Sequence, residues 1–160
     1  MGRALMRTNG AWSGSDALSG ARQRTLPDGQ EVTSIPMALL DGPSFAALSG
    51  ARDIRFDLAQ GVSHGTRTGT RASHDGHVEI VGALKSGARV RRRLFISDPE
   101  GMGRMTAPGF AVAATRILGL DGAPAPAGGL YTPETLLSPH AASAHLRAAG
   151  LLIEERDADA

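Results

Sequence analysis

The chain has 160 residues, of which 41% are hydrophobic and 4% aromatic, and its formal net charge is +1. This length is sufficient for one domain with its own hydrophobic core. The near-neutral charge and the scarcity of aromatic side chains argue against a nucleic-acid partner, which would need a basic surface and stacking rings. Because the sequence has no cysteine, disulfides, thiolate catalysis and cysteine-based zinc sites are excluded.

No membrane partner is expected either. The longest apolar stretch, residues 110–120, is too short and too interrupted to span a bilayer. The arginines at positions 3 and 7 precede no apolar run, so no signal peptide is predicted. The absence of cysteine fits a reducing compartment, and we therefore expect a cytoplasmic protein.

The first part of the chain predicts a hairpin after a less regular segment. Residues 1–21 are rich in glycine, serine and alanine without periodicity, and are expected to be a partly flexible N-terminal segment. Residues 22–26 and 31–35 are β-prone and flank a Pro-Asp-Gly turn. Pro36 is expected to end the second strand, because proline has no backbone donor.

The next segment predicts a helix and then a strand. A short helix is expected over residues 44–48, because a Gly-Pro pair precedes it and Gly50 follows. Ile54, Phe56 and Leu58 alternate with charged residues, which is the pattern of a strand that buries these three side chains.

A meander of three antiparallel strands is predicted next. Asp75-Gly76 and Ser86-Gly87 supply two turns between β-prone runs. The outer face of this sheet would be rich in arginine, including the run at positions 91–93. The predicted strands span residues 66–73, 77–84 and 88–97.

A helix with an apolar stripe is expected after the meander. Thr106 is the predicted cap, and Pro108 would lie in the first turn, where proline is tolerated. The helix is expected to end at Gly119 or Gly122. Apolar residues at helical spacing form the predicted core stripe: Phe110, Ala113, Ala114, Ile117 and Leu118.

The end of the chain predicts a second helical segment and a strand. Thr132 is the predicted cap, followed by a proline at the first helical position and a glutamate in the first turn. The helix is expected to restart at Ser138 and to stop at Gly150. Residues 151–153 predict a last strand, and residues 154–160 a solvated acidic tail.

The spacing of the polar residues gives only weak candidates for a metal site or a catalytic site. His64, His74 and His77 cluster in the sequence, but their spacing matches no standard zinc motif, so no metal site is assigned. Neither a nucleophile elbow nor a recognisable catalytic triad is present, and the catalytic residues are unknown.

The sequence Gly101-x-Gly103-Arg104 is expected to form a loop before a helix, where it could present donors to an anion. A dinucleotide fingerprint would need a third glycine where Thr106 stands, directly after a first buried strand. No P-loop occurs either. We therefore assign no cofactor-binding residue in this chain.

Three segments, in order, resemble the C-terminal half of saccharopine dehydrogenase-like oxidoreductases. The first is residues 24–36, RTLPDGQEVTSIP. The second is the predicted meander leading into Met105-Thr106-Ala107 and its helix. The third is residues 128–137, GGLYTPETLL, with the closing helix. The similarity covers about residues 22–153, and the order of these short motifs carries it.

In that family an N-terminal Rossmann domain binds NAD(P), and the C-terminal domain forms much of the substrate side and commonly the dimer contact. The resemblance implies a stand-alone or truncated substrate-binding and dimerisation domain without its own Rossmann domain, as one subunit of a split oxidoreductase. NAD(P) would then bind only through a partner subunit with a Rossmann domain, and the chain alone would not be a complete dehydrogenase.

The alternative is a non-catalytic domain that binds a small anionic or apolar ligand or assembles with itself. The expected architecture is α+β, with a mixed, mostly antiparallel sheet and helices packed on one face. Arg104, Tyr131 and Thr132 are the candidate substrate-binding residues, because two predicted helix N-termini there offer free donors. Helix capping and tyrosine packing explain the same residues without a ligand. The expected partner is a second copy or a Rossmann-domain subunit.

Overall fold

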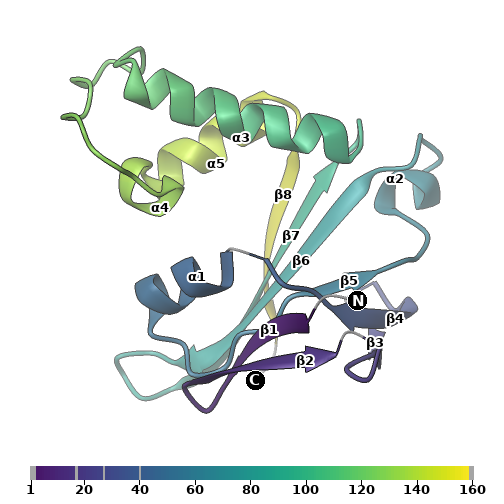
Figure 1. Cartoon of the computed structure of the whole chain (residues 1–160). Helices are drawn as coiled ribbons and strands as arrows, with labels where there is room; N and C mark the ends of the chain where they lie inside the picture. Colours follow the sequence, from purple (N-terminus) through teal and green to yellow (C-terminus); the bar gives the residue numbers. More distant parts are fainter. Residues whose placement is uncertain (1–2, 17, 27, 40, 159–160) are drawn as a thin grey trace. The chain divides into compact units, whose positions relative to one another are not determined.

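A computed structural model of the chain describes residues 3–16, 18–26, 28–39 and 41–158 (Figure 1). The chain divides into two compact units, Met1–Gly61 and Val62–Ala160, called here the first unit and the second unit. The predicted α+β class is confirmed. The described strands form three sheets rather than one, and their pairings are antiparallel.

The first unit begins with a hairpin that periodicity did not predict. Strands β1 (Arg3–Thr8) and β2 (Ala11–Asp16) pair along their whole length. Asn9 and Gly10 connect them with φ angles of 52° and 87°, the left-handed conformations that a tight hairpin turn requires. The Asn-Gly pair was therefore the informative signal in a segment without clean alternation.

The second hairpin of the first unit is confirmed. Strands β3 (Arg22–Thr25) and β4 (Glu31–Pro36) pair antiparallel, and β4 ends at the predicted proline. Helix α1 (Asp41–Ser49) is longer than expected. The strand predicted to bury Leu58 is wrong in part, because β5 (Asp57–Ala59) is a short edge strand and Leu58 is 52% exposed.

The sheet of the second unit has the order β6-β7-β8. Strands β6 (His74–Ala83) and β7 (Arg89–Asp98) form a long hairpin, and the predicted Ser86-Gly87 turn is confirmed by a φ of 87° at Gly87. Strand β8 (Leu152–Ala158) pairs with β7. The prediction of a solvated tail from residue 154 is therefore wrong for residues 154–158, which belong to β8 because they pair with β7. Residues 159–160 lie outside the described residues.

Two predictions for the start of the meander are wrong. Asp75-Gly76 is not a turn but lies inside β6, and the segment 66–73 is not a strand. Helix α2 (His64–Arg67) and a loop occupy its place. The reason is local polar bonding, since the Ser63 hydroxyl oxygen accepts the Thr66 N–H and stabilises a helical turn.

Three helices complete the second unit. Helix α3 (Met102–Ile117) begins before the predicted cap Thr106, because Gly101 precedes it with a φ of 88°; the predicted glycine-rich loop is thus partly its first turn. Helices α4 (Pro133–Leu136) and α5 (Pro139–Ala148) follow the predicted caps Thr132 and Ser138. The predicted stop at Gly150 agrees with a φ of 93°.

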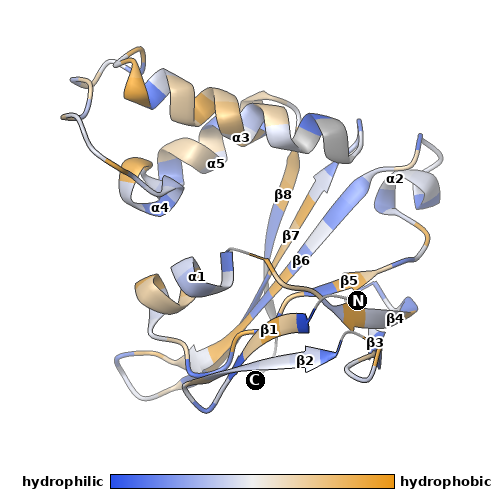
Figure 2. Cartoon of the chain, in the orientation of Figure 1, coloured by the Kyte–Doolittle hydropathy of each residue, from blue (hydrophilic) through white to orange (hydrophobic). Residues whose placement is uncertain are grey.

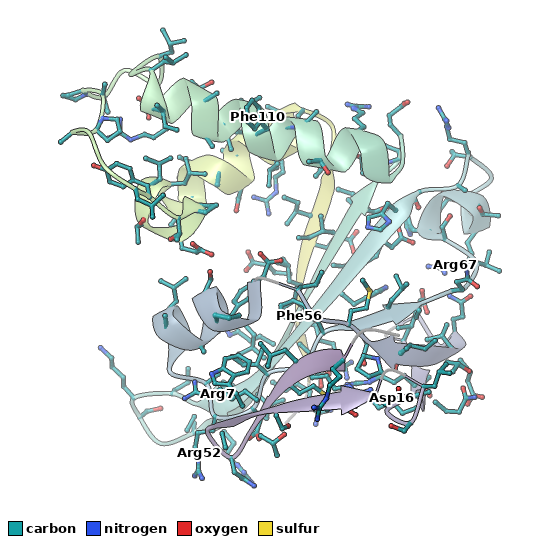
Figure 3. All side chains as sticks on the ribbon, viewed as in Figure 1. Arg7, Asp16, Arg52, Phe56, Arg67 and Phe110 are labelled. Carbon is teal, nitrogen blue, oxygen red and sulfur yellow. The ribbon has the colours of Figure 1, made fainter. Side chains whose placement is uncertain are left out.

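The apolar stripe predicted for α3 is not a core. Phe110, Ile117 and Leu118 are 75%, 51% and 66% exposed, whereas Ala113 and Ala114 are half-buried. Helix α3 packs against α5 and β7, and these contacts leave the large side chains of the stripe uncovered. Figure 2 shows the apolar residues along α3, and Figure 3 shows where Phe110 lies on it. Few hydrophobic residues are fully buried in the described parts of the chain: Ala4, Val32 and Leu151.

Candidate functional site

An open cavity of about 320 Å³ lies among α3, α4 and α5 in the second unit. Such a volume is at the lower end of the range for small-molecule sites. Its walls combine apolar and polar side chains. The apolar residues are Val112, Ala123, Leu136, Leu137 and Ala141. The polar residues are Thr115, Arg116, Asp121, Ser138 and His145.

Helical spacing brings these side chains to one place. Val112, Thr115 and Arg116 are three and four residues apart, and therefore share one face of α3. Ala141 and His145 are related in the same way on α5. Helices α3 and α5 lie side by side (Figure 1), and the short helix α4 adds the third wall.

Arg116 is the most constrained polar group of the cavity. Its Nη1 donates to the carbonyl oxygen of Pro124 at 2.7 Å, which ties the loop after α3 to the helix. Its Nε lies 3.7 Å from Asp121 Oδ2, beyond hydrogen-bond distance, and the Arg116 side chain is 24% exposed. Arginine carries five N–H donors. The guanidinium is therefore held in place and keeps donors for a ligand.

The other polar groups add both donors and acceptors, because the Asp121 carboxylate lies in the lining, accepts the Ala123 N–H at 3.1 Å and forms an ion pair with Arg116. The Ser138 oxygen accepts the Ala141 N–H at 3.2 Å, which leaves its own hydroxyl proton for another acceptor. The Thr115 hydroxyl donates to the Ala111 carbonyl oxygen at 2.8 Å and is already used. Within this set, Arg116 and the Ser138 hydroxyl are the groups that can donate to a ligand with acceptor oxygens, such as a carboxylate.

The structure does not bring the three sequence-based candidates together. Arg104 lies in the first turn of α3, where its Nη2 donates to the carbonyl oxygen of Ala149 at the end of α5, and its Nη1 is 3.6 Å from Glu100. Arg104 and Arg116 are about 18 Å apart along the helix. Arg104 thus stabilises the C-terminus of α5. It does so at the first turn of α3, which is the end of α3 that is far from the cavity.

Tyr131 and Thr132 lie just before α4, next to the cavity in sequence. The Tyr131 hydroxyl donates to the Ala127 carbonyl oxygen at 2.7 Å, and the ring lies against Gly129. The Thr132 N–H donates to Thr135 Oγ1 at 3.2 Å, which caps the helix. Substrate binding by these residues and by Arg104 stays a prediction.

Sequence reasoning missed Arg116, Asp121 and His145. No short motif marks Arg116, and the segment 123–127 that follows it is an alternation of alanine and proline. The site depends on the loop after α3 folding back onto Arg116, which a local pattern does not encode. The only local signal was the Ser138 cap, which places a hydroxyl at the start of α5.

A second polar cluster joins α2 to the β6–β7 hairpin. Asp75 accepts the His64 N–H at 2.6 Å and the hydroxyls of Ser73 and Ser97 at 2.8 and 2.7 Å. Burial raises the pKa of Asp75, but these hydrogen bonds and the charge of the His64 ring outweigh it and lower the pKa below its usual value. The cluster holds structure together and lines no cavity described here.

The three clustered histidines do not converge on a metal. His74 and His77 are three residues apart on one strand, and their side chains therefore leave opposite faces of the sheet. The rings of His64 and His77 pack against Phe95, with centroids 5.3 and 4.9 Å away. Within the described residues, no three potential metal ligands come together.

No protein-family model matches the chain, and no curated protein matches it either. Among the described helices, none has both the length and the apolar character that a membrane span requires.

Proposed function

We propose that the chain is a ligand-binding domain for a small carboxylate and supplies the substrate side of an NAD(P)-dependent oxidoreductase of the saccharopine dehydrogenase-like type. The observation that carries ligand binding is the cavity beside Arg116. The segment 128–137, which resembles that family, contributes Leu136 and Leu137 to its wall. The proposed site and the resemblance therefore meet in the same part of the chain.

The chemistry of the cavity favours an amphipathic acid. A volume of about 320 Å³ holds roughly ten atoms the size of a water molecule, at about 30 Å³ each. Arg116 and Ser138 provide donors for the carboxylate, and a charge-assisted hydrogen bond is stronger than a neutral one. Val112 and Leu137 provide apolar surface for a short hydrocarbon body.

The redox cofactor belongs to the proposed partner. A Rossmann domain is built from parallel strands and crossover helices, whereas the strand pairings of the described residues are antiparallel. Hydride transfer needs a nicotinamide held against the substrate. We therefore propose that NAD(P) is bound by a Rossmann-domain subunit, and that the chain alone binds no NADPH in calorimetry. No residue of this chain is assigned to hydride or proton transfer.

Calorimetry with hexanoate tests the site. Hexanamide has the same size without the charge, and is expected to bind at least tenfold more weakly. Arg116→Gln should weaken hexanoate binding about tenfold, a change of about 1.4 kcal/mol. Ala141→Leu should also weaken it, because the larger side chain fills the cavity without altering Arg116. The control Arg89→Gln changes an exposed arginine outside the cavity, and should leave the affinity unchanged.

The proposal fails if hexanoate does not bind, if hexanamide binds equally well, or if the cavity variants bind like the Arg89→Gln control. The second candidate is a non-catalytic ligand-binding or self-assembly domain, favoured by the position of β6 at the edge of its sheet. Turnover of a carboxylate substrate with NADPH, seen only when a Rossmann-domain subunit is added, would separate the oxidoreductase from this second candidate.

A further inference from the structure

We propose that β6 pairs antiparallel with β6 of a second copy of this chain, about a twofold axis beside Ile80. In the sheet of the second unit β6 is an edge strand, since β7 is its one partner there. The pairing would join two three-stranded sheets into one six-stranded sheet. This inference needs no ligand and does not depend on the proposed function.

The hydrogen-bonding phase of the hairpin shows which backbone groups face the free edge. The Leu84 N–H donates to the Ala88 carbonyl oxygen at 2.9 Å, so this pair is a hydrogen-bonded one. Bonded and non-bonded pairs alternate along an antiparallel ladder. Even-numbered residues of β6 therefore bond to β7. The odd-numbered ones direct their N–H and C=O groups away from β7, among them Glu79, Val81 and Ala83.

The exposed part of this edge is centred on Ile80. Residues 77–83 are all exposed, whereas residues 74–76 are half-buried beside the Asp75 cluster. A twofold axis at Ile80 uses the whole exposed segment. It sets Glu79 of each copy opposite Val81 of the other copy. These two residues of each strand would then exchange about four hydrogen bonds with the other copy.

The side chains select this register. Ile80 is 63% exposed and would meet its own copy at the axis, which shields two large apolar side chains from water. Glu79 is the only Asp, Glu, Lys or Arg in the segment, and Arg93 Nε lies 2.9 Å from its Oε2 in the same sheet. Moving the axis to Glu79 would place two glutamates opposite each other, and directly opposed like charges are destabilising.

The two edges of the sheet differ in their protection. In natural proteins, lysine, proline, bulges or other charged residues in an edge strand prevent it from pairing with another chain. Residues 77–83 contain neither lysine nor proline, and their register with β7 is continuous. The other edge strand, β8, carries four consecutive charged residues, Glu154, Glu155, Arg156 and Asp157, and charged residues protect an edge strand against pairing with another chain. The geometry therefore favours β6 rather than β8 as the self-pairing edge.

Disulfide trapping tests the pairing in the full chain. Because the chain has no cysteine, Ile80→Cys can be cross-linked only to another copy. Opposed residues in a non-bonded antiparallel pair have Cα atoms about 4.5 Å apart, within the range for a disulfide. The control Val78→Cys lies on the same face, but its two copies would be about 14 Å apart along the strands.

Under mild oxidation, Ile80→Cys is expected to become a covalent dimer on a non-reducing gel, and Val78→Cys to stay monomeric. Cross-linking at Val78 instead, or at neither position, would overturn the proposal.

Light scattering gives a second readout. Val81→Pro removes an outward N–H without removing a bond to β7, and should convert a dimer to a monomer. Leu118→Lys changes the residue that follows α3, far from β6 in the sequence, and should leave the dimer intact. A Val81→Pro variant that stays dimeric would also contradict the proposal that the chains pair through the edge of β6.

Discussion

The carboxylate of Asp75 accepts the backbone N–H of His64 at 2.6 Å, and so fastens the start of α2 to the first residues of β6. Two serine hydroxyls donate to its other oxygen, Ser73 at 2.8 Å and Ser97 at 2.7 Å. One carboxylate thus connects a helix, a loop and two strands. This explains why the chain is helical where an extended strand was expected.

Replacing this carboxylate should destabilise the second unit in a pH-dependent way. Asp75→Asn is expected to lower the free energy of unfolding by about 1–2 kcal/mol at pH 7, because charge-assisted hydrogen bonds are lost. The pKa of folded Asp75 is lowered. Its contribution is therefore complete above the unfolded pKa of about 3.9 and disappears as the pH falls through the folded pKa. Urea unfolding at pH 7 and pH 3 measures this difference, and an equal gap at both values would contradict it.

Gly65 should tolerate no side chain. It is buried in α2, and an added Cβ would collide with the carbonyl oxygen of Arg71. Gly65→Ala is expected to cost about 1–3 kcal/mol, as over-packing does. The control Gly109→Ala lies in α3 with open space around it, and should raise stability by up to about 1 kcal/mol through helix propensity. Thermal unfolding compares the two, and similar effects of both changes would refute the packing argument.

Arg104 is expected to act on stability rather than on the ligand. Arg104→Gln removes the donor to the Ala149 carbonyl oxygen, and should lower the free energy of unfolding by about 0.5–1.5 kcal/mol. Hexanoate affinity should not change, because Arg104 lies at the far end of α3. Loss of hexanoate binding in this variant would instead favour the substrate-binding role expected from the sequence.

Local signals predicted the elements that local bonding decides. Thr132, Ser138 and Gly150 delimit helices in the expected places, since a cap needs only its neighbouring residues. Elements that depend on distant partners were missed. The predicted acidic tail is strand β8 through Ala158, because β7 pairs with it, and the predicted turn at Asp75-Gly76 is extended because it pairs with Ser97 and Ile96.

The candidate site was less predictable than the fold. Arg116 resembled an ordinary surface arginine near the end of a helix. Its role follows from the contact with the Pro124 carbonyl oxygen, and that contact depends on how the loop returns to α3. The edge of β6 was equally hidden, because residues that alternate along a strand do not show whether a neighbouring strand covers them.

Amide chemical shifts of the ¹⁵N-labelled chain during a hexanoate titration test the central claim most directly. The cavity predicts saturable shifts concentrated at Val112, Arg116, Leu137, Ala141 and His145. It also predicts that these shifts saturate only at higher hexanoate concentrations in Arg116→Gln and in Ala141→Leu. Shifts that cluster elsewhere, or that grow linearly without saturation, would show that this cavity is not a carboxylate site.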